Sequence, residues 1–205
     1  MEKIFKLGDR ILWGGSGESG FIQRARERLE AEHKGGIGKF TKEASDVCSN
    51  IRKIVVSLGK SELENLATPR DERLKRTKFL FCGIAGDRPW IFEVIGDGTA
   101  TRYEETPGFH ATGSAAHFAY AAFGLLRHHG VNAHGERGGL VVAYRILESS
   151  VTLAAGGVGE PLQYWILSKS GVRQPSPDEV RNVKETVGLW SESEKDALGK
   201  ALGGQ

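Results

Sequence analysis

The chain has 205 residues, of which 39% are hydrophobic and 26% charged, and its formal net charge is +2. These values are those of an ordinary globular domain, and they exclude a strongly basic nucleic-acid-binding protein. No apolar run is long enough to span a bilayer, and the first residues show no signal-peptide pattern. We therefore expect a cytoplasmic protein with neither nucleic acid nor membrane as a partner.

The first predicted elements are a β-hairpin and two helices. Residues 3–7 and 11–15 are rich in apolar residues and flank a Gly8-Asp9 turn, which is typical of a hairpin. Ser19 is predicted to cap a helix that runs to about Glu32. A second amphipathic helix is predicted from about Lys42 onward.

A β-meander is predicted next, because the apolar period changes to two after Lys78. Its strands are expected at residues 79–84, 90–95, 99–104 and 109–112, with glycine-rich turns between the first three. The preceding stretch, Arg70 to Lys78, is the most positive part of the chain but also contains acidic residues. We predict that this stretch is a solvated loop.

Helices return after the meander and are predicted over residues 114–128 and 139–153. A last apolar strand is expected over residues 162–167, followed by a Lys169-Ser170-Gly171 turn. The polar tail is predicted to be helical, with helix starts at Pro177 and Ser191.

Helix pairs therefore alternate with groups of strands along the chain. This order predicts an α+β fold, namely a four-layer α/β/β/α sandwich of antiparallel sheets flanked by helix pairs. A single antiparallel sheet covered on one face is the alternative. We expect a main domain over residues 1–173 and a polar helical tail over residues 174–205.

Four short motifs follow one another in this framework. They are Lys3-Ile4-Phe5-Lys6-Leu7, Ser16-Gly17-Glu18-Ser19-Gly20, Thr112-Gly113-Ser114-Ala115-Ala116, and the loop and strand from Gly156 to Leu167. In this order they resemble the proteasome β-subunit family of N-terminal nucleophile hydrolases, over residues 3–173. The resemblance implies a proteasome-like fold, a threonine-type peptidase acting on peptides, a homo-oligomer or ring, and no cofactor.

The resemblance assigns roles to three residues. Lys3 falls at the position of the catalytic lysine, which lowers the pKa of the nucleophile and assists proton transfer. Gly17 falls at the glycine whose backbone N–H binds the oxyanion. Ser114 falls at a serine that forms hydrogen bonds near the α-amino group of the nucleophile.

Other parts of the family pattern are missing. Only Met1 and Glu2 precede Lys3 in the sequence, so no threonine nucleophile with a free α-amine stands before it. Ala155 and Val158 replace a supporting Asp-x-x-Ser. We therefore expect the chain as written to be inactive. It is then either a truncated form of an active peptidase or a natural, non-catalytic subunit of a ring assembly.

Histidines offer two further candidate sites. The first is a possible zinc site formed by His128, His129, His134 and Glu136. A polar helix end is the favoured interpretation of these residues, because a single loop seldom forms a complete zinc site. His110 and His117 flank Ser114 as candidate general bases. The sequence fixes no acidic partner for either, so a core or surface role is favoured.

The remaining candidates are two cysteines and a helix start. Cys48 and Cys82 are isolated, and we expect both to be reduced core residues. The Ser16–Gly20 turn is a candidate anion site at a helix N-terminus, but it lacks the Gly-Lys-Ser/Thr ending of a phosphate loop.

Overall fold

The computed structural model describes residues 3–34, 44–64, 71–103, 108–131, 133, 135–153, 159 and 161–203. The fold is mixed α+β, as predicted, with a five-stranded antiparallel sheet and a two-stranded sheet. The chain forms two compact units. Unit 1 comprises Met1–Ala116 and Leu167–Arg173, and unit 2 comprises His117–Ile166 and Gln174–Gln205.

The five-stranded sheet of unit 1 begins with the predicted hairpin, in which the Leu7 N–H donates to the Ile11 carbonyl at 2.9 Å. All neighbouring strands in this sheet are antiparallel. In order across the sheet, the strands are β1 (Ile4–Lys6), β2 (Ile11–Ser16), β3 (Lys78–Ala85), β4 (Arg88–Ile95) and β5 (Ala100–Tyr103). The first three strands of the predicted meander are thus confirmed.

One face of this sheet carries a row of aromatic side chains. Phe5, Trp13, Phe81 and Phe92 are cross-strand partners, and the centroids of neighbouring rings lie 4.8, 5.7 and 6.3 Å apart. Such partners stand on the same side of a pleated sheet and stabilise it by direct contact. The row forms the centre of the hydrophobic core of unit 1.

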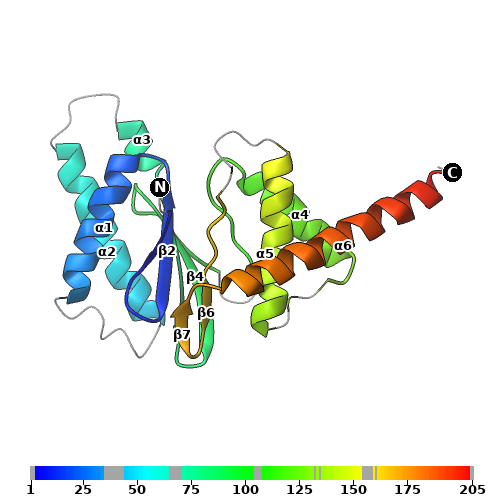
Figure 1. Cartoon of the computed structure of the whole chain (residues 1–205). Helices are drawn as coiled ribbons and strands as arrows, with labels where there is room; N and C mark the ends of the chain where they lie inside the picture. The colour runs from blue at the N-terminus through cyan, green and yellow to red at the C-terminus, as the bar shows by residue number, and fades with distance from the viewer. Residues whose placement is uncertain are drawn as a thin grey trace. The chain divides into compact units, whose positions relative to one another are not determined.

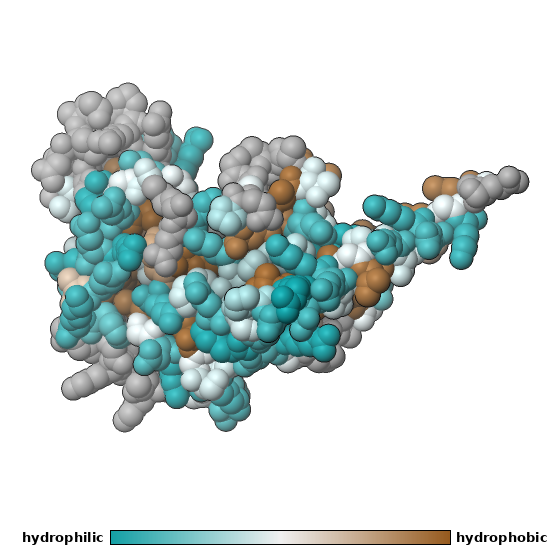
Figure 2. All heavy atoms as spheres, viewed as in Figure 1, coloured by the Kyte–Doolittle hydropathy of each residue, from teal (hydrophilic) through white to brown (hydrophobic). Residues whose placement is uncertain are grey.

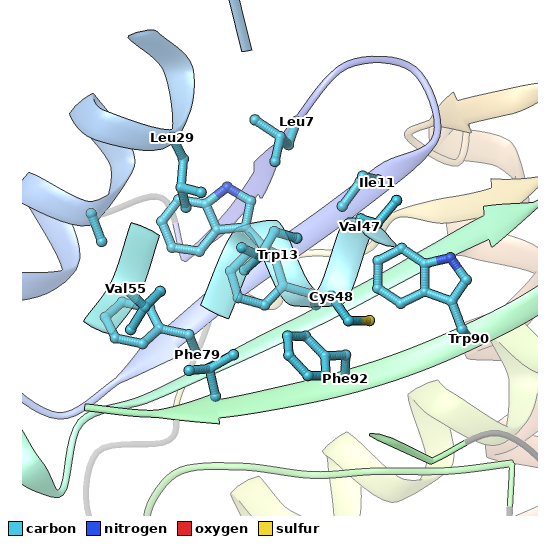
Figure 3. Packing of buried hydrophobic residues seen from close by; sticks show 14 of the residues in the cluster. Leu7, Ile11, Trp13, Leu29, Val47, Cys48, Val55, Phe79, Trp90 and Phe92 are labelled. Atoms are coloured by element: carbon cyan, nitrogen blue, oxygen red, sulfur yellow. The ribbon is translucent and has the colours of Figure 1, made fainter. Parts of the chain in front are cut away.

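Two helices, α1 (Ser19–Lys34) and α2 (Ala44–Glu64), lie against the aromatic face (Figure 1). Both follow the predicted amphipathic pattern, with buried residues recurring every three or four positions. Figure 3 shows Leu29 of α1 and Val47 and Val55 of α2 pointing toward the strands that carry Trp13 and Phe79.

The opposite face of the sheet carries several polar residues among its apolar ones. Because side chains alternate along a strand, the cross-strand partners Ser16 and Lys78 lie on this face. Leu80 and its partner Glu93 form the next row on the same face. This side is called the polar face below.

Two predictions for unit 1 are wrong. Residues Asp71–Lys75 form a short helix, α3, because Leu74 is buried in the core. Residues 109–112 are not a strand, and the side chains of His110 and Thr112 contact the sheet instead.

Unit 2 contains α4 (Ala116–His128), α5 (Gly135–Thr152) and α6 (Pro177–Ala201), which are coloured from green to red in Figure 1. Both helices predicted between residues 114 and 153 are confirmed, with shifted ends. A small core joins α5 and α6, formed by Leu140, Tyr144, Ile166, Val183 and Val187.

The tail is a single helix, and not two as the sequence predicted. Ser176 caps α6 and forms a reciprocal capping box with Glu179. The second predicted start lies within the helix, where Ser191 and Glu194 bind Arg145 of α5 at 3.0 and 2.6 Å.

The last predicted strand, residues 162–167, corresponds to β6 (Ile166–Ser168), which is shorter and begins later. β6 pairs with a further strand, β7 (Gly171–Arg173), across the predicted turn at Lys169. Residues 162–165 are outside any strand. None of the helices in the described ranges is long and apolar enough to cross a membrane.

Candidate functional site

Two of the three residues assigned by the resemblance lie on segments that meet at one end of the sheet. The hydroxyl oxygens of Ser16, the last residue of β2, and of Thr112 lie 3.0 Å apart. A Cβ placed on Gly113 would lie 3.7 Å from the Ser16 Cβ. Gly17 and Ser114 directly follow Ser16 and Gly113 in the chain, so the turns that carry them are in contact.

Gly17 occupies a conformation that requires glycine. Its φ is +124°, and a Cβ there would lie 2.7 Å from the Thr77 Oγ1. Thr77 is fully buried, accepts the Glu18 N–H at 3.0 Å through its hydroxyl, and accepts the Gly96 N–H at 2.8 Å through its carbonyl. Thr77 therefore holds the backbone of the Gly17 turn in place.

The start of α1 is stabilised differently from the prediction. The Glu18 carboxylate, and not Ser19, accepts the N–H of Phe21. Ser19 is itself the first residue of the helix. A carboxylate at this position neutralises the positive end of the helix dipole, so the chain supplies its own anion at the candidate anion site.

Lys3 reaches the same end of the sheet. It immediately precedes β1 and is exposed. A Cβ placed on Gly14 would lie 2.8 Å from the Lys3 carbonyl oxygen, and Gly14 precedes Ser16 by two residues on β2. A lysine, a glycine turn and a serine turn are thus carried by neighbouring segments.

A buried ion pair lies on the polar face. The Glu93 carboxylate contacts the His110 Nε2 at 2.9 Å and the Lys78 Nζ at 3.5 Å. His110 therefore has the acidic partner that the sequence did not identify. His117 lies in α4 instead, where its ring contacts Phe118 with centroids 4.2 Å apart.

Sequence reasoning missed most of the residues that build this end of the sheet. Glu93 offered one signal, since it is the only charged residue in the apolar run from Trp90 to Ile95. Ser16 and Thr112 belonged to quoted motifs but were given no role of their own. No local pattern marked Thr77 or Lys78, whose partners are distant in sequence.

No group of three or more histidine, cysteine or acidic side chains among the described residues could hold a metal ion. His128 is the last residue of α4, and His129 lies in the turn that follows. His134 lies outside the described residues. Ala155 and Val158 lie outside them as well.

Both cysteines are free thiols; Cys48 is a buried core residue as predicted, whereas Cys82 is only partly buried. Burial raises the pKa of Cys48 and that of Cys82 to about 11 each. Neither thiol is therefore a nucleophile at neutral pH, because only the thiolate is reactive.

No family model matches the chain, and neither does any curated protein. The arrangement of residues at this end of the sheet and the motif resemblance are therefore the basis for a functional proposal.

Proposed function

We propose that the chain is a subunit of a peptide-bond hydrolase of the N-terminal nucleophile type. The observation that carries this proposal is the contact between Ser16 and Thr112, which joins the turns of Gly17 and Ser114. In the resembled family, an oxyanion donor and a supporting serine occupy these two turns. The meeting of two segments that are 96 residues apart in sequence supports the proposal.

Each residue has a defined role under this proposal. The Gly17 N–H donates to the oxyanion that develops on the substrate carbonyl, in a turn that is already fixed by Thr77. Lys3 assists proton transfer at the nucleophile, and the Ser114 hydroxyl binds near its α-amine. None of these residues is the nucleophile; in the truncated-peptidase alternative, a hydroxyl or thiol beside a free α-amine would complete the site.

The same proposal extends the fold. We propose a four-layer α/β/β/α sandwich, in which the polar face of the five-stranded sheet packs against a second sheet. The aromatic face, covered by α1 and α2, supplies the first two of these layers. The apolar residues Leu12 and Leu80 lie on the polar face, which supports the packing of another layer against this face.

The test uses the protein isolated from its natural host, with the mature N-terminus identified by mass spectrometry. We expect a threonine, serine or cysteine at that N-terminus and hydrolysis of fluorogenic peptides. Lys3→Ala should lower kcat by about 100-fold or more, as expected for loss of a proton-transfer group. Lys6→Ala is the matched control, because Lys6 is also an exposed lysine of the same hairpin.

Equal effects of Lys3→Ala and Lys6→Ala would contradict the proposed role of Lys3. Absence of hydrolysis, together with a mature chain that starts at Met1, would contradict the peptidase proposal itself.

A second candidate is a non-catalytic structural subunit of a homo-oligomeric ring with the same fold. It is favoured by exposed leucines on α6, since large exposed apolar side chains often mark protein interfaces. An assembled protein with no peptidase activity in its mature form would support this candidate.

A further inference from the structure

The polar face of unit 1 contains a carboxylate that is almost completely buried. The side chains of Glu93 and His110 are each only 6% exposed, and the Glu93 Oε2 lies 2.9 Å from the His110 Nε2. Lys78 contacts the other carboxylate oxygen at 3.5 Å, and its side chain is 42% exposed. A buried carboxylate is costly unless it is paired and hydrogen-bonded, so these contacts are needed for Glu93 to remain in the sheet.

His110 belongs to a different part of the chain from the strand that carries Glu93. It lies in residues 108–115, which precede α4 and form neither a helix nor a strand. This stretch is called the connecting segment. Two side-chain contacts connect it to the sheet, His110 with Glu93 and Thr112 with Ser16.

These two contacts differ in strength. The Ser16–Thr112 contact joins two neutral hydroxyls in a part-buried place. The contact between His110 and Glu93 involves a carboxylate in a low-dielectric environment, where hydrogen bonds to charged groups are stronger. The Glu93 contact is therefore the dominant anchor of the two.

We propose that Glu93 is a positioning residue, which acts through His110 to hold the connecting segment, and with it Ser114, against the Gly17 turn. Its effect on catalysis rests on the proposed function, whereas the anchoring itself does not. Glu93 is fixed in the middle of β4, between Leu80 of β3 and Thr101 of β5, so it provides a rigid point of attachment.

Hydrogen exchange of the full chain tests the anchoring without any assay of activity. Glu93→Gln and His110→Leu should accelerate amide exchange in residues 109–115 by roughly ten- to hundred-fold, as expected for loss of a hydrogen bond to a charged group. His110→Gln should restore most of the protection, because its side-chain amide can still donate to Glu93. Packing alone would not distinguish glutamine from leucine in this way.

Val94→Ala is the matched control for a general loss of stability. Val94 is the next residue of β4, is fully buried, and faces the aromatic side of the sheet. It should lower global stability without selective acceleration of exchange in the connecting segment. If Glu93→Gln does not fold, the comparison of His110→Leu with His110→Gln decides the question alone.

Unchanged exchange in residues 109–115 of the Glu93 and His110 variants would overturn the proposal. Equal exchange in His110→Gln and His110→Leu would overturn it as well. If the mature protein hydrolyses peptides, Glu93→Gln should lower kcat about ten-fold or more with little change in KM. An unchanged kcat in Glu93→Gln would refute the positioning of Ser114. A wholly inactive wild type would refute the proposed function, and hydrogen exchange would still test whether Glu93 anchors the connecting segment.

Discussion

At the scale of single residues, the packing of Thr77 against Gly17 makes a clear demand on amino-acid identity. A side chain at Gly17 would be strained by the φ of +124° and would also collide with the Thr77 Oγ1 and Cα, at 2.7 and 2.8 Å. Thr77 cannot easily yield, because it is fully buried and holds both Glu18 and Gly96 by hydrogen bonds. The geometry of this turn is therefore determined by packing as well as by backbone preference.

We predict that Gly17→Ala lowers the free energy of unfolding by roughly 3 kcal/mol, from backbone strain and overpacking together. Gly86→Ala is the matched control, since Gly86 also has a positive φ, of +59°, but a Cβ there would meet nothing within 4 Å. It should cost only about 1 kcal/mol. Urea denaturation of the two variants measures the difference, and equal losses would show that Thr77 does not constrain the turn.

The raised pKa of the Cys82 thiol predicts a dependence of stability on alkaline pH. Its pKa is about 11 in the folded protein and about 9 when exposed. Above pH 9 the unfolded chain therefore loses the thiol proton first, which favours unfolding, and the stability present below pH 9 is lost as the pH rises toward 11. Between pH 8 and pH 10 this loss should amount to about 1 kcal/mol.

The measurement compares urea unfolding of the wild type and of Cys82→Val at pH 8 and pH 10. Other groups titrate equally in both proteins, so the difference between the two pH-dependent losses isolates the thiol. Identical losses in the two proteins would contradict the raised pKa of Cys82.

At the scale of elements, the sequence predicted helices and strands wherever the apolar period was continuous. The aromatic row is an example. Trp13 of β2 and Phe81 of β3 each belong to a segment with an apolar period of two, and the pairing of these strands brings both rings to the same face of the sheet. The prediction failed at residues 109–112. Their alternation suits a strand, but their anchors are Glu93 and Ser16, which are distant in sequence and carry no periodic signal.

The candidate site divides in the same way. Lys3, Gly17 and Ser114 were identified because they belong to short motifs that can be compared with a family. Thr77 and Glu93 could not be assigned roles, since each acts through a contact that exists only after the sheet has formed. A lone charge in an apolar strand is the one local feature that singles out Glu93.

The capping box of α6 gives a prediction for a single element. Ser176 accepts the Glu179 N–H at 3.2 Å, and the Glu179 carboxylate accepts the Ser176 N–H at 2.7 Å. Ser176→Ala should lower the free energy of unfolding by about 1 kcal/mol. Ser193→Ala is the matched control, because Ser193 is exposed within the same helix and bonds only the Leu189 carbonyl behind it.

Thermal unfolding followed by circular dichroism measures both serine variants. Ser193→Ala should be neutral or slightly stabilising, since alanine is the better helix former. A loss at Ser193 as large as that at Ser176 would show that the cap contributes nothing of its own.

At the scale of the whole molecule, α6 extends beyond α5 (Figure 1), and the colours in Figure 2 show apolar residues along its exposed end. Its buried stripe begins with Val183 and Val187, which pack against α5. Helical periodicity continues this stripe to Leu198 and Leu202, which are 60% and 84% exposed. Leu189 is 67% exposed but lies on the opposite side of the helix.

The proposed homo-oligomer accounts for this continuation, because a second copy of the chain would cover what α5 leaves exposed. We predict that the purified protein has a mass above that of the 22.3 kDa monomer in multi-angle light scattering.

A double variant, Leu198→Gln with Leu202→Gln, should shift the mass toward the monomer with little change in thermal stability, since both residues lie beyond the packed stripe. Leu189→Gln, a comparably exposed change on the other side of α6, should leave the assembly intact. A monodisperse wild-type monomer would contradict the proposed assembly, and equal effects of the two variants would contradict the role of the stripe.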